Sequence, residues 1–281
     1  MSGRPEIFRT VREVRTAVAE KRRRGRVGLV PTMGALHEGH LALVREARRL
    51  SGWTLVSIFV NPTQFGPGED LSRYPRDEAG DLAKLAGEGA HAVFAPSVEE
   101  MYPEGFATRI SVSGPAEGLE TDFRPHFFTG VATVVAKLLL ATGPDLAIFG
   151  EKDYQQLTVI RRMVADLAIP VEIIGHPTIR EPDGLALSSR NVYLTPEERR
   201  IAPRLYATMA EAAAGIRSQG EPMEILLAAR RALSEAGFRL DYMELRHALT
   251  LQPVGDPRND PARLLAAAWL GKTRLIDNLP V

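Results

Sequence analysis

Short apolar segments alternate with amphipathic segments along the chain up to residue 175, and this alternation limits the possible folds more than any other feature. The apolar segments are rich in aliphatic and β-branched residues and span residues 26–30, 54–60, 92–95, 146–149 and 171–174. Apolar residues at helical spacing mark the segments between them, at 40–50, 77–88, 130–140 and 155–167. Strands that alternate with helices form βαβ units, which build a parallel sheet with helices on both faces. We therefore predict an α/β fold with a Rossmann-like, doubly wound parallel sheet.

The N-terminal segment 7–24 precedes the first predicted strand. Its residues Ile7, Val11, Val14 and Val18 follow helical spacing, so we predict a single helix here. The basic run 21–24 then lies at the helix C-terminus, where the helix dipole favours cations. We interpret this run as a solvated helix end rather than as a nucleic-acid patch.

The pattern changes after residue 195, where alanine-rich helical segments replace the strand–helix alternation. Thr195 begins the first of them as an N-cap, with Pro196 at the first helical position and Glu198 completing a capping box. We predict helices at residues 197–218 and 222–236, and strands at residues 241–245 and 263–269. The last of these segments also has helical propensity. The predicted domains are a Rossmann-like domain at residues 1–178 and a smaller α+β domain at residues 179–281.

Charge and cysteine content argue against several classes of function. Lys plus Arg and Asp plus Glu both number 35, and a general nucleic-acid binder usually has a basic excess. The absence of cysteine excludes disulfides, thiolate metal sites and a cysteine nucleophile. No apolar stretch approaches the roughly 20 residues that span a bilayer, and the N-terminus lacks the apolar core of a signal peptide. We therefore expect a cytoplasmic protein that binds neither nucleic acid nor membrane.

A segment that contains glycine and histidine, PTMGALHEGH at residues 31–40, links the strand at 26–30 to a helix. In a doubly wound sheet this junction is the carboxyl end of a strand, where ligands bind. Gly34 and Gly39 allow the backbone to approach a phosphate closely, and the helix offers amide N–H groups and the positive end of its dipole. His37 and His40 can both face this ligand and donate hydrogen bonds to an α-phosphate as charge builds on it.

Other interpretations of His37 and His40 are weaker. A single histidine in a loop is usually a satisfied surface or core residue, but two histidines around a glycine at a strand-to-helix junction rarely arise by chance. Zinc binding needs at least a third protein ligand, and no residue at a matching spacing is obvious. We therefore predict phosphate binding for this pair.

Further polar segments occur along the chain in a fixed order. They are SIFVNPTQF at residues 57–65, DLSRYPR at 70–76, FGEKDYQQ at 149–156 and GLALSSRN at 184–191. Strand–loop–His-x-Gly-His–helix resembles the first signature of the nucleotidyltransferase superfamily that includes class I aminoacyl-tRNA synthetases. The full string PTMGALHEGH and the further segments resemble the pantothenate synthetase family more narrowly. The stretch AAAWLGKTRLIDN at residues 266–278 also resembles this family, and we expect its role to be structural.

The resemblance implies roles for individual residues in these segments. The implied catalytic residues, which stabilise charge on the reacting phosphates, are His37, His40, Lys152 and Arg190. The implied contacts to ATP come from Met33, Gly34, Gly39, Gly150, Asp153, Leu187, Ser188 and Ser189. The implied contacts to pantoate come from Pro31, Gln64 and Gln156. The residues alone leave open a helix cap for Asp153 and an ordinary polar turn at Ser188.

The chemistry of two of these side chains agrees with the implied roles. Lys152 presents a point charge suited to phosphate oxygens, and Arg190 can hold a phosphate through two parallel hydrogen bonds. For two other residues the resemblance is less specific. It implies that Tyr74 belongs to the wall of the β-alanine site, with a packed aromatic as the alternative. It implies that Asp81 helps to hold Mg²⁺, with a solvated helix face as the alternative.

The chain departs from the family pattern in one segment. Members of the family commonly have Arg-Pro-x-His-Phe before Gly-Val, whereas here the histidine, His126, stands one position earlier. We therefore assign no site role to His126. Thr63 replaces the methionine that is usual in NPxQF, which we interpret as a tolerable change in a site wall.

The activity that the resemblance implies is an ATP-dependent condensation of pantoate with β-alanine through a pantoyl-adenylate, which releases AMP and pyrophosphate. ATP would enter with Mg²⁺, the loop LSSRN at 187–191 would close over the site, and the enzyme would be a homodimer. Two alternatives are a sibling adenylyl- or cytidylyltransferase and a non-catalytic nucleotide- or RNA-binding module. The context of PTMGALHEGH and SIFVNPTQF argues against the first, and the zero net charge with intact polar loops argues against the second.

Overall fold

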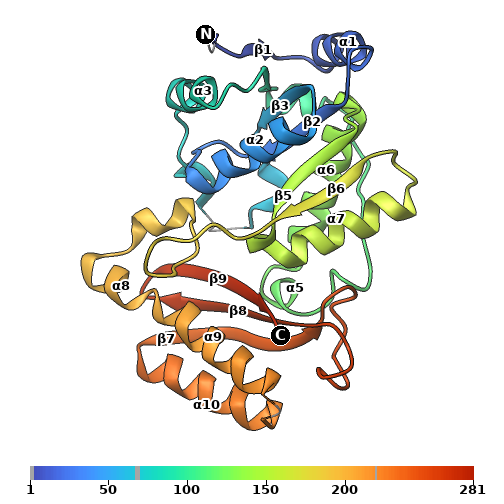
Figure 1. Cartoon of the computed structure of the whole chain (residues 1–281). Helices are drawn as coiled ribbons and strands as arrows, with labels where there is room; N and C mark the ends of the chain where they lie inside the picture. Colours follow the sequence, from blue (N-terminus) through green and yellow to red (C-terminus); the bar gives the residue numbers. More distant parts are fainter. Residues whose placement is uncertain (1–2, 67–69, 219) are drawn as a thin grey trace. The chain divides into compact units, whose positions relative to one another are not determined.

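The computed structural model describes residues 3–66, 70–218 and 220–281, which belong to two compact units (Figure 1). Unit 1 combines the chain up to residue 112 with residues 124–151 and 159–177. Unit 2 combines residues 113–123 and 152–158 with residues 178–281. That residues 1–178 and 179–281 are the two domains stays a prediction.

Unit 1 contains a six-stranded parallel sheet in the order β1-β4-β3-β2-β5-β6. Its strands are β1 (Glu6–Phe8), β2 (Val27–Thr32), β3 (Trp53–Ile58), β4 (Ala92–Phe94), β5 (Leu146–Gly150) and β6 (Glu172–His176). Strands β2, β3 and β5 are apolar and buried along nearly their whole length, as expected for parallel strands covered on both faces. The predicted Rossmann-like sheet is confirmed.

Helices connect these strands and bury the faces of the sheet. They are α1 (Val11–Arg22), α2 (Glu38–Leu50), α3 (Glu78–Gly87), α4 (Val98–Met101), α6 (Phe127–Thr142) and α7 (Tyr154–Asp166). Val44 of α2 and Leu85 of α3 pack in one apolar cluster with Val30, Val56 and Ile148 of the sheet. Figure 1 shows α2 in front of the sheet and α6 behind it.

The order of the strands reverses between β2 and β5. From β2 the chain adds β3 and β4 on one side, and it then crosses over to add β5 and β6 on the other side. Ligands of open parallel sheets bind outside the carboxyl ends of the strands at such a reversal. The segments that leave these two ends begin at Met33 after β2 and at Glu151 after β5.

Unit 2 contains a three-stranded antiparallel sheet in the order β7-β8-β9. Its strands are β7 (Phe238–His247), β8 (Ala262–Leu270) and β9 (Thr273–Pro280), and its helices are α5 (Glu120–Phe123), α8 (Pro196–Ile201), α9 (Arg204–Arg217) and α10 (Pro222–Glu235). Met209 of α9 and Leu233 of α10 share a hydrophobic core with Met243 of β7 and Leu264 of β8. The predicted smaller α+β part is confirmed.

Short 3₁₀ helices carry several of the polar segments: η1 (Pro62–Gln64), η2 (Asp70–Ser72), η3 (Glu151–Asp153) and η4 (Ser189–Tyr193). No helix within the described ranges is both long and apolar enough to cross a membrane.

Two of the predicted helices are wrong in extent. Ile7 lies in β1, where it pairs with Val93, and the helix begins only after Thr10, whose capping box with Glu13 fixes its start. The helix predicted at 197–218 is two helices, because Pro203 cannot continue the hydrogen-bond ladder of α8. The predicted capping box at Thr195 is confirmed. Strand β9 was not predicted.

Candidate active site

The predicted site residues divide between the two units. Unit 1 carries Pro31, Met33, Gly34, His37, Gly39, His40, Gln64, Tyr74, Asp81 and Gly150. Unit 2 carries Lys152, Asp153, Gln156, Leu187, Ser188, Ser189 and Arg190. Strands β2 and β3 pair in register up to Thr32 and Ile58, so the segments that follow them leave the sheet at neighbouring points. The role of each residue stays a prediction.

The loop that follows β2 turns sharply before α2. Gly34 and Ala35 both have left-handed backbone conformations, with φ of 80° and 52°. Glycine adopts this conformation freely, but for alanine it is uncommon and costs on the order of 1–3 kcal/mol. The loop therefore needs contacts that hold Ala35 in place.

A buried carboxylate from α3 supplies these contacts. Asp81 is only 2% exposed, and its two oxygens accept the amide N–H groups of Ala35 and Leu36, each at 2.8 Å. Lys84, one turn further along α3, donates from its Nζ to the carbonyl of Leu36 at 2.7 Å. Asp81 and Lys84 thus brace the loop that leads to the two histidines, and the solvated helix face expected for Asp81 as an alternative is not what the structure has.

His37 and His40 cap the N-terminus of α2 reciprocally. The Nδ1 of His37 accepts the amide of Gly39 at 3.1 Å, and the Nδ1 of His40 accepts the amide of His37 at 3.3 Å. A ring nitrogen that accepts a hydrogen bond carries no proton, so the neutral ring carries its proton on Nε2. The ring centroids lie 4.1 Å apart. Each neutral ring therefore carries an Nε2–H donor, and both rings lie at a helix N-terminus, where the dipole favours an anion.

Gln64 is held in one orientation by Asn61, which we had not predicted as a site residue. The Oε1 of Gln64 accepts from the Nδ2 of Asn61 at 3.1 Å, and its Nε2 donates to the sulfur of Met33 at 3.2 Å. Asn61 is itself buried and fixed, because its Oδ1 accepts the hydroxyl of Tyr102 at 2.8 Å and its Nδ2 donates to the carbonyl of Gly130 at 3.2 Å. Burial raises the pKa of Tyr102, so its hydroxyl stays a donor.

The segment that departs from the family pattern supports the same turn. Arg124 donates to the carbonyl of Gln64 at 3.0 Å, and its guanidinium lies 3.9 Å from the centroid of the Phe127 ring. Phe127 stands where the family usually has histidine. His126 is exposed at the start of α6. Neither observation gives His126 a role in the site.

Lys152 follows the end of β5 by two residues. Its Nζ lies 3.8 Å from a carboxylate oxygen of Asp153, and its side chain is largely covered. Its carbonyl accepts a hydrogen bond from the Nδ2 of Asn278 at 2.8 Å. Strand β9 therefore holds the backbone from which Lys152 projects.

The two adjacent glutamines at the start of α7 differ in their surroundings. Gln155 is buried, and its amide accepts the N–H of Glu120 at 3.1 Å and donates to the carbonyl of Pro115 at 3.1 Å. Gln156 is half-buried. Gln155 is thus occupied in holding the segment 113–123, and Gln156 is the residue of this pair predicted to contact pantoate.

The loop with Leu187, Ser188, Ser189 and Arg190 continues from a short hairpin. The hairpin pairs Arg180 with Ala186, and Ser188 caps η4 by accepting the amide of Arg190 at 3.3 Å. The side chain of Asn191 donates to the carbonyl of Ala186 at 3.1 Å. The bond from Asn191 therefore connects η4 back to the hairpin, and Ser188 fixes the start of η4.

Tyr74 packs against an aromatic ring, and Asp81, the predicted metal ligand, bonds to backbone amides. The ring of Tyr74 is buried and lies edge-on to Phe65, with centroids 5.8 Å apart. Among the residues that the structure describes, no cluster of three or more His, Asp or Glu side chains is arranged to hold a metal ion. Both carboxylate oxygens of Asp81 already accept backbone amides, which argues against a further bond to Mg²⁺. Its role as an Mg²⁺ ligand stays a prediction.

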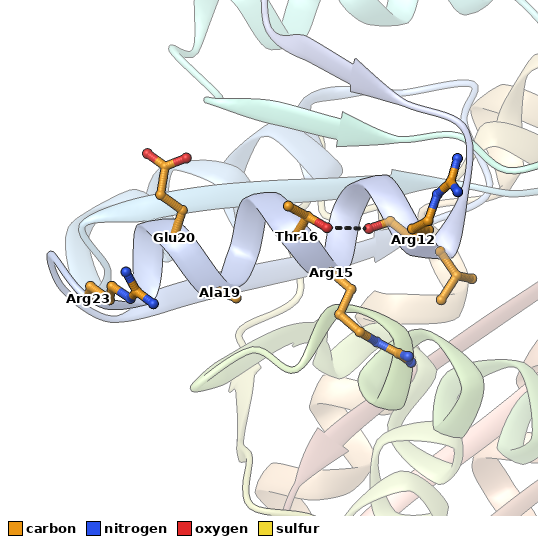
Figure 2. A pocket seen from close by; sticks show the side chains of 7 residues that line it. Arg12, Arg15, Thr16, Ala19, Glu20 and Arg23 are labelled. Atoms are coloured by element: carbon orange, nitrogen blue, oxygen red, sulfur yellow. Dashed lines mark hydrogen bonds between the residues drawn. The ribbon is translucent and has the colours of Figure 1, made fainter.

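The surface is hollowed along α1, as Figure 2 shows. The residues that line this hollow all come from 11–23, and they include Arg12, Arg15, Glu20 and Arg23. Arg15 donates to the carbonyl of Leu140 at 3.3 Å. The hollow contains none of the predicted site residues, and we assign it no function.

The parallel sheet, with two histidines at the start of α2 beside the reversal of its strand order, defines an α/β protein of the nucleotide-binding class. The sequence model of the family described as pantoate–β-alanine ligase matches residues 6–280. The chain belongs to this family, and it is a ligase.

Relatives and solved structures agree with this assignment. The chain is 57% identical to a pantothenate synthetase of Rhodopseudomonas palustris over 279 residues, which are 99% of each chain. It is 55% identical to one of Rhodospirillum rubrum over 98% of each chain. The crystal structure of pantothenate synthetase from Thermus thermophilus superposes with a TM-score of 0.91 at 52% identity, over 98% of each chain. That of pantoate–β-alanine ligase from Francisella tularensis superposes with a TM-score of 0.82 at 35% identity, over 98% of this chain and 97% of that one.

Proposed function

We propose that the chain condenses pantoate with β-alanine in two steps, using ATP and forming a pantoyl-adenylate. The observation that carries the proposal is the pair of imidazoles that cap α2 reciprocally, in a chain of this family. The related structure from Francisella tularensis is described as complexed with "Beta-gamma ATP" and β-alanine, which supports two of the three substrates.

In the first step a carboxylate oxygen of pantoate attacks the α-phosphorus of ATP. The bond between the α-phosphorus and the oxygen that joins it to the β-phosphorus breaks, and pyrophosphate leaves with the electron pair of that bond. The Nε2–H groups of His37 and His40, the ammonium of Lys152 and the guanidinium of Arg190 stabilise the charge that builds on the phosphates. Mg²⁺, bound with ATP, would supply neutralisation of the phosphate charge.

In the second step the amine of β-alanine attacks the acyl carbon of the adenylate. The bond from that carbon to the phosphate oxygen breaks, AMP leaves with this oxygen, and the amine loses a proton. Gln64 and Gln156 hold pantoate through its hydroxyls and carboxylate. Because an amide that loses its partner is costly when buried, analogues of pantoate that lack a hydroxyl should be rejected strongly.

Pantoate labelled with ¹⁸O in its carboxylate tests the intermediate. A route through pantoyl-adenylate transfers one label to AMP, whereas a route through an acyl phosphate gives ADP and labelled inorganic phosphate. Labelled AMP together with pantothenate is the expected result. Pyrophosphate without pantothenate would instead indicate a sibling nucleotidyltransferase, and no pyrophosphate at all would refute the proposal.

The predicted homodimer and the cytoplasmic location stay predictions. A monomeric mass by light scattering at micromolar concentration would refute the dimer.

A further inference from the structure

Two neighbouring residues of β9, Asp277 and Asn278, bond to two different loops of unit 2. Both side chains are buried, at 4% and 3% exposure. They lie in the C-terminal stretch for which the sequence predicted only a structural role. Buried polar side chains are retained at a cost unless their hydrogen bonds are made, so the partners of these two residues show what they do.

Asn278 divides its amide between the sheet and the segment of Lys152. Its Nδ2 donates to the carbonyl of Lys152 at 2.8 Å, across 126 residues of sequence. Its Oδ1 accepts from the Nε of Arg263 at 2.6 Å, and that guanidinium lies 3.7 Å from the centroid of the Tyr154 ring. The bond to Arg263 fixes which end of the amide faces Lys152, so the donor is aimed at the carbonyl.

Asp277 holds the base of the hairpin that precedes Ser188. Its two oxygens accept from the guanidinium of Arg180 at 2.6 and 2.8 Å, a paired geometry that sets both distance and direction. Arg180 also donates to the carbonyl of Gly184 at 3.1 Å, inside the turn of the hairpin. Its guanidinium lies 3.9 Å from the centroid of the Tyr206 ring. Arg180 therefore connects the hairpin to Asp277 of β9.

We infer that Asp277 and Asn278 are positioning residues that set Lys152 and the loop 188–190 at fixed points relative to one strand. Adjacent residues of a strand cannot move independently, so a shift of either loop disturbs the other. This inference rests on the proposed function, in which Lys152 and Arg190 act on the phosphates of the same ATP. Misplacement of such groups by about 1 Å is enough to cost about 100-fold in rate.

The variant Asn278→Asp separates positioning from packing. It keeps the shape of the side chain and the acceptor for Arg263, but it replaces the donor to the carbonyl of Lys152 by an oxygen. The matched control is Asp241→Asn in β7, because the side chain of Asp241 is also polar and only 4% exposed. Its bonds go to Trp269 and Arg274 and not to either loop.

We expect Asn278→Asp to lower kcat/KM by about 100-fold and Asp241→Asn not to lower it to that extent. The two variants should have similar thermal unfolding midpoints. Adding Asn278→Asp to Lys152→Ala should cost much less than it does alone, because Lys152 is then already lost. Hydrogen–deuterium exchange of residues 150–157, in the protein without substrates, should rise in Asn278→Asp and not in the control.

Either of two kinetic outcomes would overturn the inference: near-normal kcat/KM in Asn278→Asp, or full additivity with Lys152→Ala. Unchanged exchange at residues 150–157 would do the same without reference to activity. An inactive wild-type protein would refute the proposed function instead, and the exchange measurement would then still decide whether Asn278 holds this segment.

Discussion

The carboxylate of Asp81 accepts a 2.8 Å hydrogen bond from the backbone amide of Leu36, which lies 45 residues earlier in the chain. Its other oxygen accepts the backbone amide of Ala35, which has a left-handed backbone conformation. A carboxylate from α3 thus determines the shape of the loop that places His37 and His40 at the start of α2.

We expect Asp81→Asn to weaken this loop. One of the two acceptors becomes an NH₂ group that faces an amide N–H, so the free energy of unfolding should fall by about 1–3 kcal/mol. Turnover should fall as well, because the histidines lose their fixed position. If Asp81 acts as a brace, the Mg²⁺ concentration that gives half-maximal rate stays the same in the variant.

The second change Ala35→Gly provides a control for this interpretation. Glycine adopts the left-handed conformation without strain, so Ala35→Gly should restore part of the activity and stability lost in Asp81→Asn. A large rise in the Mg²⁺ requirement, with no rescue by glycine, would show that Asp81 is a metal ligand.

Asp145 should make stability depend on pH in the acid range. Burial alone would raise the pKa of this carboxyl, but bonds from the amide of Val27 at 2.7 Å and from the guanidinium of Arg22 at 2.8 Å outweigh it and lower the pKa. The unfolded state therefore binds the proton more readily. The stabilisation is complete above the unfolded pKa of about 3.9 and is lost as pH falls through the folded pKa.

Urea unfolding of Asp145→Asn over a pH series measures this contribution. The variant should be less stable than wild type at pH 6, and the two curves should converge below about pH 4. The exposed residue Glu235 offers a control, and Glu235→Gln should follow wild type throughout. A difference for Asp145→Asn that is constant down to pH 2 would contradict the assignment.

The central part of the fold could be predicted from the sequence because its signals are local. Strands β2 to β6 are short apolar runs between helices with clear periodicity. Strand β1 was missed because its three residues fit either a strand or the start of a helix, and only its pairing with β4 decides between them. Strand β9 was missed because Asp277 and Asn278 interrupt its apolar pattern, and the partners that satisfy them lie 97 and 126 residues away.

His40 and Lys152 should each be required for turnover. Removing one preorganised donor to a developing oxyanion costs about 10²- to 10³-fold in kcat, so His40→Ala and Lys152→Ala should reduce kcat at least to that extent. The matched controls are His126→Ala and Lys272→Ala, since both side chains are exposed. Circular dichroism should show an intact fold in all four variants. Near-normal turnover in His40→Ala or Lys152→Ala would remove that residue from the mechanism.

The candidate site shows the same division between local and distant signals. The segment with His37 and His40 was found because two histidines, a glycine and a helix start lie within four residues. The roles of Asp81 and Asn278 as supports were not found, because each acts on a backbone group that is remote in sequence. Asn61 lies in the same turn as Gln64 and directly precedes a proline. From the sequence alone, an asparagine in this position is an ordinary turn residue, so its role as a support was not predicted.

Asn61 and Gln64 lead to a prediction about substrate selectivity. Asn61→Ala removes the donor that fixes the amide of Gln64, so we expect a higher KM for pantoate and a kcat/KM lower by about 100-fold. Gln64→Ala should lower kcat/KM for pantoate much more than for an analogue that lacks one hydroxyl, because the wild-type amide rejects that analogue by losing its partner. The ratio of kcat/KM for the two substrates, measured in wild type and Gln64→Ala, checks this. An unchanged ratio would mean that Gln64 does not contact a hydroxyl of pantoate, and the orientation imposed by Asn61 would then serve only the packing of the turn.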